Sequence, residues 1–232
     1  MIILGLETSG GTASVAVCKR DGIIAQTGLL SNRTHSQIIM PMLKDVLRYA
    51  ELSLEDIYGF AVSQGPGSYT GLRIGVSAIK AIGFSLSKQC AGISTLESLA
   101  FNMAGFIGYI RPVMAARGEL VYTALFESDG DKIKRIEPDK IREISEVIQE
   151  TKSLEGNVVI NGDFCTHIKS AELFESPNIK QAPPHLRLQQ ASSLCFACFD
   201  KFDEHGDNAF IDLDHLNADY MEKTLAEKEI ES

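Results

Sequence analysis

The chain has 232 residues, of which 44% are hydrophobic, and its formal net charge is −9. This is enough apolar material for one sizeable core or two small lobes, and no apolar run approaches the roughly 20 residues of a membrane span. The acidic balance argues against a chain that grips nucleic acid by itself, because strong binders carry a basic stripe. Residues 1–4 have no basic region and read as a buried strand, not as a secretory signal.

The first hundred residues alternate between strand and helix patterns. Three strands within 27 residues are indicated, with a hairpin signal at Asp21-Gly22. Apolar residues at helical spacing predict a helix over 35–50, followed by a strand at 58–62. A glycine-rich turn then leads into a helix over 69–87, a short strand over 90–93, and a helix capped by Thr95.

The second half repeats this pattern in abbreviated form. Strands are predicted at 112–115, 121–126 and 158–160, and helices at 143–151 and 188–202. The spacing supports the α/β class, and the order of the first elements describes half of a ribonuclease-H-like unit. We therefore expect an N-terminal lobe over 1–104, a smaller C-terminal lobe over 105–215, and a mobile tail over 216–232.

The chain has five cysteines, an odd number without the spacing of a disulfide framework. The close pair Cys195 and Cys198 lies in an apolar helical pattern, with no second pair or histidine to complete a zinc set. We therefore expect buried free thiols, and a reducing, cytoplasmic location.

The most informative stretch is the glycine-rich turn over residues 64–75. Glycines on both sides of a proline, between a strand and a helix, can expose backbone amides to an anion. The same pattern also describes a tight turn with close backbone packing, and the residues alone leave both interpretations open. It is neither a Walker A loop nor a dinucleotide fingerprint. The residues concerned are Gly65, Gly67, Ser68, Thr70 and Gly71.

Residues 64–98 closely resemble the universal glycoprotease-like family that makes threonylcarbamoyladenosine in tRNA. The segments 4–9, 34–41 and 115–122 agree, so the resemblance covers residues 2–126 well and the remainder loosely. It implies the actin-like, sugar-kinase-like fold with two ribonuclease-H-like lobes. Two departures, Glu7 and Ala115 where the family often has aspartate, weaken any claim of metal-assisted nucleotide chemistry.

Catalytic members of this family carry two histidines four residues apart after the glycine-rich helix, a spacing that suits a transition metal. Thr95 and Leu99 occupy those places here, so we expect no metal site and no cofactor. His35 matches a family position but lies at a helix start, which favours a capping or packing role. The resemblance therefore implies a non-catalytic partner subunit. An ADP-binding module and an enzyme, a weak nucleotide hydrolase or a metal-dependent transferase or peptidase, are the alternatives.

The glycine-rich helix has a second apolar face formed by Ile74, Ala78 and Ala81, opposite its core-facing stripe. Either other parts of the chain cover this face, or it meets another protein. The resemblance implies pairing through the first two helices with the catalytic threonylcarbamoyltransferase subunit, and a homodimer when that subunit is absent. It also implies a small P-loop ATPase as third component. The expected interface residues are Ile74, Ala78, Ala81, Ile38, Met42, Arg73 and Ser77.

Overall fold

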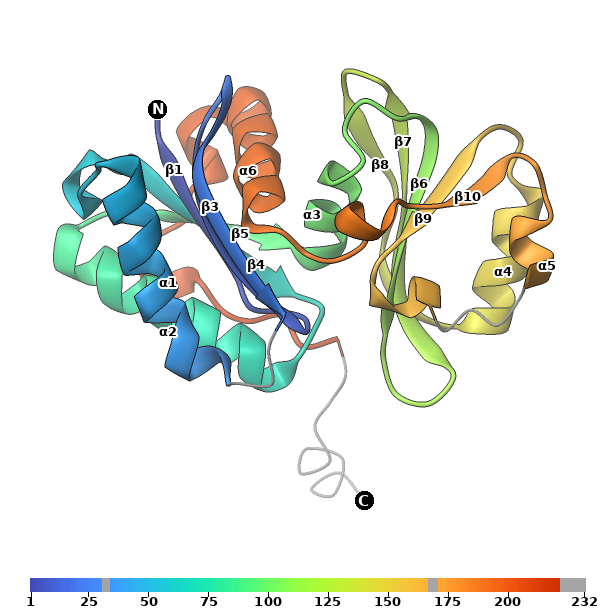
Figure 1. The fold of residues 1–232 in the computed structure, drawn as a ribbon, viewed down its shortest axis with the longest axis horizontal. Coiled ribbons are helices and arrows are strands. Elements are labelled where there is room, and N and C mark those ends of the chain that lie inside the picture. Colours follow the sequence, from blue (N-terminus) through green and yellow to red (C-terminus); the bar gives the residue numbers. More distant parts are fainter. Residues whose placement is uncertain (31–33, 167–170, 222–232) are drawn as a thin grey trace.

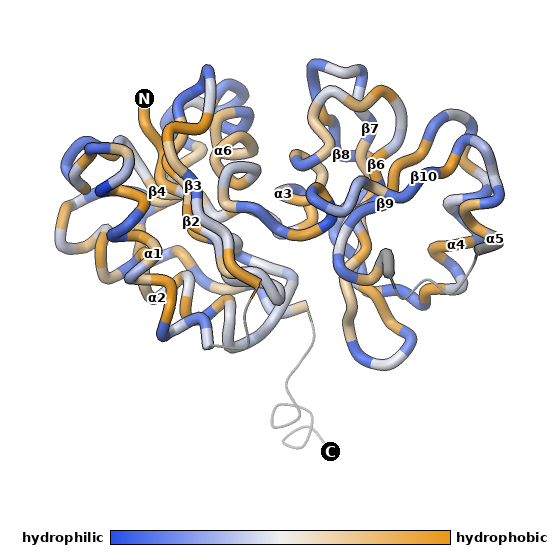
Figure 2. The backbone as a smooth tube through the Cα atoms, in the orientation of Figure 1, coloured by the Kyte–Doolittle hydropathy of each residue, from blue (hydrophilic) through white to orange (hydrophobic). Residues whose placement is uncertain are grey.

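The computed structural model describes residues 1–30, 34–166 and 171–221, which form two α/β lobes side by side (Figure 1). Each lobe is built on a five-stranded sheet. The tube is mostly hydrophobic along the central strands and hydrophilic along the outer loops (Figure 2). In the described part of the chain, no helix is both long and apolar enough to cross a membrane.

The first sheet has the strand order β3-β2-β1-β4-β5. Strands β1, β2 and β3 are antiparallel, whereas β4 and β5 run parallel to β1. This is the ribonuclease-H-like arrangement that the order of the early elements predicted. The strands are Ile3–Glu7 (β1), Thr12–Lys19 (β2), Gly22–Leu30 (β3), Gly59–Gly65 (β4) and Cys90–Ser94 (β5).

Helices cover both faces of the first sheet, because alternate strand residues point to opposite sides. Leu4 and Leu6 pack in one core cluster with α1 (His35–Ala50) and α2 (Tyr69–Leu86). On the opposite face, Ile3 packs in a second cluster with the long helix α6 (Ala191–His205). Figure 1 shows α1 and α2 beside each other on the side away from α6.

The second sheet has the order β10-β9-β6-β7-β8, so that β8 is an edge strand. Helix α4 (Ile144–Ser153) covers its outer face, together with the short α5 (Ala171–Phe174) (Figure 1). The strands are Ile107–Ala115 (β6), Leu120–Asp129 (β7), Ile133–Glu143 (β8), Val158–Asn161 (β9) and Ile179–Gln181 (β10). Short 3-10 turns lie at Leu54–Asp56, Asp163–Thr166, Pro184–Leu186, Gly206–Ala209 and Leu213–His215.

Helix α3 (Thr95–Phe101) lies between the two sheets and joins the lobes. Its buried residues Leu96 and Leu99 share a core cluster with the inner face of the second sheet. Polar contacts reinforce the junction, because Ser94 Oγ donates to Asp139 Oδ2 at 2.6 Å. Arg135 of β8 also pairs with Asp139 and, at 3.4 Å, with Glu97 of α3.

Two features at the C-terminal end differ from the sequence-based expectation. Helix α6 was assigned to the second lobe, but it packs on β1 and β2 of the first sheet. The segment 216–221 was expected to be mobile, yet Leu216 is fully buried in the core of the first lobe. The rest of the expected tail, residues 222–232, lies outside the described residues.

The free thiols lie in the core of the first lobe, where Cys195 and Cys198 of α6 share a cluster with Cys18 of β2. Cys18, Cys90, Cys195 and Cys198 are buried and unpaired, as predicted, while the side chain of Cys165 lies outside the described part. Burial raises the pKa of Cys198 to about 12. A thiol held protonated in this way is an inert core group.

Candidate functional site

The glycine-rich turn connects β4 to α2 at the edge of the first lobe. It contains a cis peptide bond between Gly65 and Pro66, and Gly65 has a φ of +138°, which residues with a side chain rarely adopt. Ser68 is the N-cap of α2, and its hydroxyl accepts a hydrogen bond from Gly71 N at 3.2 Å. The side chain of Thr70 is exposed.

This turn packs directly against the turn that follows β1. Ser68 N donates to Ser9 O at 2.7 Å, and Thr8 Oγ1 donates to Gly71 O at 2.8 Å. A Cβ atom added to Gly71 would lie 2.0 Å from Thr8 O, and one added to Gly67 would lie 2.4 Å from Ser9 O. The glycines are therefore required for the close approach of two backbones, and the amides of Ser68 and Gly71 are satisfied within the chain. This geometry favours the tight-turn interpretation over the phosphate cradle.

A cleft of about 660 Å³ lies between the lobes, next to these two turns. On one side it is bounded by the glycine turns, and on the other by Ala115, Arg117 and Asp163 of the second lobe. Asp163 Oδ1 accepts a hydrogen bond from Ala115 N at 2.9 Å. At the position where the family often has an aspartate, this chain has Ala115. The exposed methyl group of Ala115 provides no carboxylate to the cleft.

Glu7, at the end of β1, is fully buried beneath the glycine turns. Its Oε1 accepts hydrogen bonds from Ser9 N at 2.6 Å, Ser9 Oγ at 2.5 Å and Ser63 Oγ at 3.0 Å. Its Oε2 is buried without a hydrogen-bond partner among the described residues. Desolvation by burial raises the pKa of Glu7 above its ordinary value, although the hydrogen bonds from Ser9 and Ser63 oppose this. In the chain by itself, this environment disfavours the charged form of the Glu7 carboxyl.

Glu7→Gln is expected to raise the melting temperature, and to raise it more as the pH increases from 4 to 8. A raised native pKa means that the unfolded chain ionises first, so the wild type loses stability as the pH rises through this range. Glutamine keeps an acceptor oxygen but cannot ionise. Thermal unfolding across this pH range measures the trend, with the exposed Glu55→Gln as control. A constant difference between wild type and Glu7→Gln would contradict the expectation.

The places of the family's metal-binding histidines are fully buried. Thr95 and Leu99 have no exposed surface, and Leu99 lies in the interlobe core. Thr95 was predicted to cap α3, and this prediction is wrong. The N-cap is Ser94, because Ser94 Oγ accepts the hydrogen bond from Glu97 N. His35 forms a hydrogen bond between Nε2 and Gly10 O at 2.8 Å. Among the described residues, no group of three or more side chains could hold a metal ion.

The expected interface residues fall into three groups in the structure. Ile38 and Met42 are only 6% and 8% exposed, because they pack in the core of the first lobe, so they offer little surface to a partner. Ile74 and Ala78 are half-buried against the same core. Arg73, Ser77 and Ala81 are exposed on the outward side of α2.

Phe84 extends this outward side and was missed by sequence reasoning. It is 55% exposed, although it is a large aromatic residue in the last turns of α2. At 100° per residue it falls on the same side as Arg73 and Ser77, which the helical spacing alone would have revealed. We call the exposed residues Arg73, Ser77, Ala81 and Phe84 the α2 stripe.

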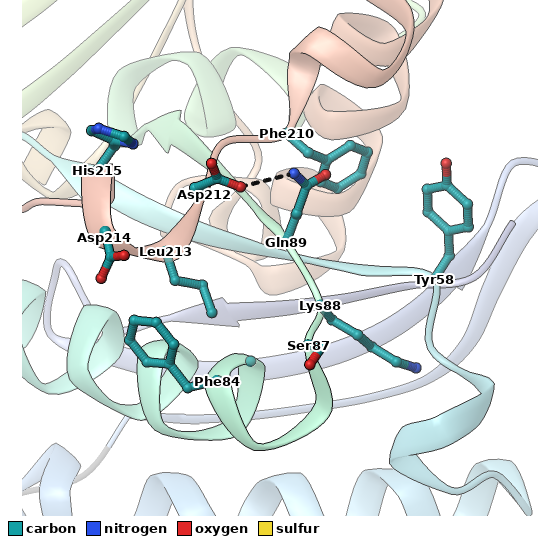
Figure 3. Close-up of a pocket in the computed structure, with 11 residues that line it drawn as sticks. Tyr58, Phe84, Ser87, Lys88, Gln89, Phe210, Asp212, Leu213, Asp214 and His215 are labelled. Carbon is teal, nitrogen blue, oxygen red and sulfur yellow. Dashed lines mark hydrogen bonds between the residues drawn. The ribbon is translucent and has the colours of Figure 1, made fainter.

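A groove of about 550 Å³ lies at the C-terminal end of the α2 stripe (Figure 3). Phe84 and Leu213 line it on one side and Phe210 and Tyr58 on the other. The ammonium group of Lys88 in this groove is bound within the chain, because Lys88 Nζ donates to the carbonyl oxygens of residues 54, 55 and 57. The surface of the groove is mixed polar and apolar, because its lining also includes Gln89, Asp212, Asp214 and His215.

Comparison with solved structures defines the class of protein. YeaZ from Pseudomonas aeruginosa superposes with a TM-score of 0.74 and 18% identity, over 95% of this chain and 99% of that chain. The ROK hexokinase from Thermus thermophilus superposes with a TM-score of 0.51 and 8% identity, over 88% of this chain and 100% of that chain. The chain is thus a two-lobed α/β protein of the actin-like ATPase fold, as the sequence predicted.

Comparison of sequences identifies the family. The family described as TsaD, tRNA N6-adenosine threonylcarbamoyltransferase, matches residues 23–182, so the chain belongs to that family. Within it, the chain is similar to the Bacillus subtilis tRNA threonylcarbamoyladenosine biosynthesis protein TsaB, with 35% identity over 140 residues. The aligned region spans 60% of this chain and 61% of that relative. The resemblance to the TsaB/YeaZ proteins is confirmed.

Proposed function

We propose that this chain is a non-catalytic partner subunit of the cytoplasmic complex that forms threonylcarbamoyladenosine in tRNA. It binds the catalytic threonylcarbamoyltransferase subunit and supports its activity. The observation that carries this proposal is the α2 stripe, in which Ala81 and Phe84 expose apolar surface between polar neighbours. Contiguous exposed apolar surface marks interaction sites, and Ala81 and Phe84 are neighbours one turn apart on the same side of α2.

The identity of the partner is supported by the extent of the family match. Residues 23–182 include both α1 and α2, so a catalytic TsaD-family subunit carries an equivalent pair of helices. Two equivalent faces can pair about a pseudo-twofold axis, as they do in isologous dimers. The same face would pair two copies of this chain when the catalytic subunit is absent. A stable interface buries about 800 Å² per partner, which requires the outward side of α1 as well as that of α2.

The non-catalytic role is supported by three positions. Thr95 and Leu99 fill the place of a metal-binding histidine pair, and Ala115 provides no carboxylate at the cleft. The same features weaken the alternatives, an ADP-binding module or a weak nucleotide hydrolase. The nucleotide would then belong to the catalytic subunit and to a small P-loop ATPase (TsaE-like) that joins the complex.

The decisive experiment is threonylcarbamoyl transfer to tRNA by the catalytic subunit and the ATPase, with and without this chain. Transfer is expected only when this chain is added, and this chain alone is expected to transfer nothing. Transfer by this chain alone would make it the enzyme. Full activity without it would remove it from the complex.

A further inference from the structure

The segment 216–221 forms a strap that leaves the core of the first lobe and crosses the glycine-rich turn. Asp219 N donates to Gln64 O at 2.7 Å. A Cβ atom added to Gly65 would lie 2.3 Å from Asp219 O, so the two backbones meet where no side chain fits. Together with the buried Leu216, these contacts fix the path of the strap up to the start of α2.

The strap ends in an aromatic and cationic cluster at the N-terminal end of α2. The ring of Tyr220 packs on the ring of Tyr69, with 4.4 Å between centroids, and its hydroxyl accepts from Arg73 Nε at 2.9 Å. Arg73 also donates to the Tyr69 hydroxyl, and its guanidinium lies 4.0 Å from the centre of that ring. We call Tyr69, Arg73 and Tyr220 the strap cap.

The strap cap is ordered but not buried. Tyr69 is 37% exposed and Tyr220 is 36% exposed, although each has a ring partner and a hydrogen bond. Tyrosine and arginine are enriched among the residues that dominate binding energies at protein interfaces. Side chains that are already held in place lose little conformational freedom when a partner binds.

The strap cap is continuous with the α2 stripe, because Arg73 belongs to both. Tyr220, however, lies beyond residues 23–182, the region that matches the TsaD family. The two helices are thus shared with the catalytic family, whereas the strap falls outside the shared region. The strap adds an asymmetric element to a face that is otherwise equivalent in both partners.

We propose that the strap cap is a specificity element of the docking face, with Tyr220 in direct contact with the helix pair of the catalytic subunit. This inference rests on the proposed function and names the end of the face at which the partner is recognised. The partner surface opposite Tyr220 is apolar or aromatic, so that the exposed ring packs against it.

The test is the dissociation constant between this chain and the purified catalytic subunit. Tyr220→Ala is expected to weaken binding at least 10-fold, as the loss of an interface anchor does. Asp219→Pro, which removes the N–H that fixes the strap on Gln64, is expected to weaken binding in the same direction. Ile107→Ala serves as control, because Ile107 is an exposed apolar residue at the start of β6 in the second lobe, away from this face. Unfolding temperatures are measured in parallel.

Ala81→Arg, in the middle of the α2 stripe, separates the two proposals. If Ala81→Arg abolishes binding while folded Tyr220→Ala and Asp219→Pro bind like the wild type, the strap proposal is wrong and the docking face stands. If all three variants bind like the wild type, the docking face itself is wrong. Loss of binding in Tyr220→Ala with an unchanged unfolding temperature supports the strap proposal.

Discussion

Ala81→Arg is expected to weaken binding of the catalytic subunit by about 100-fold or more. Ala81 lies at the centre of the α2 stripe, where a small side chain permits close approach of a second helix. Arginine there would add bulk and bury an unpaired charge, and a buried charge without a partner costs about 3–5 kcal/mol. Because Ala81 is exposed in the isolated chain, the unfolding temperature is expected to stay unchanged.

Titration calorimetry or surface plasmon resonance measures this effect. The matched control is Ala104→Arg, since Ala104 is also an exposed alanine but lies after α3, away from the α2 stripe. Threonylcarbamoyl transfer is expected to fall in parallel with binding for Ala81→Arg and to stay unchanged for Ala104→Arg. Wild-type affinity of Ala81→Arg would exclude the α2 stripe as the docking surface.

Gly71→Ala is expected to destabilise the first lobe by about 3 kcal/mol, at the upper end for overpacked substitutions. The added Cβ would lie 2.0 Å from Thr8 O. Neither atom can move alone, because Thr8 O is a backbone atom and the Cβ is bonded directly to the backbone of α2. Separation of the two turns would also strain the hydrogen bond from Thr8 Oγ1 to Gly71 O. In a chain of this size the change corresponds to a melting temperature lower by about 6–12 °C.

Gly11→Ala is the matched control, because a Cβ at Gly11 would have only the side chain of Leu30 nearby, at an ordinary 3.6 Å. In thermal unfolding followed by circular dichroism, we expect a lower melting temperature for Gly71→Ala than for the wild type. The melting temperature of Gly11→Ala is expected to stay nearly unchanged. Equal melting temperatures for the two variants would mean that the turn accommodates the added methyl group without a loss of stability. The glycine-rich segment would then have no packing role.

Much of the first lobe could be predicted from the sequence, because its elements have clear periods. The helix expected over 35–50 is α1, and the glycine-rich turn was correctly placed between β4 and α2. In contrast, β8 was missed. Its half-buried side alternates Ile133 and Ile141 with charged residues that form ion pairs, so its pattern looks polar throughout.

The placement of α6 could not be predicted from local sequence. Its apolar pattern indicates a buried helix, but the face that it covers belongs to β1 and β2, more than 170 residues earlier. The strap was hidden for a similar reason, since Leu216 and Tyr220 stand in an acidic, polar segment that resembles a tail. Their apolar and aromatic side chains were the signal that could have revealed it.

The return of α6 to the first sheet has a consequence for synthesis on the ribosome. All five strands of that sheet have been synthesised when β5 ends at Ser94. Helix α6, which covers one face of the sheet, ends only at His205, 111 residues later (205 − 94). At about 5–20 residues per second, roughly 6–22 s pass between the two events. During that interval the nascent chain carries an uncovered apolar surface that includes Ile3, Ala61 and Ile93. This face of the first lobe therefore stays uncovered until α6 has been synthesised.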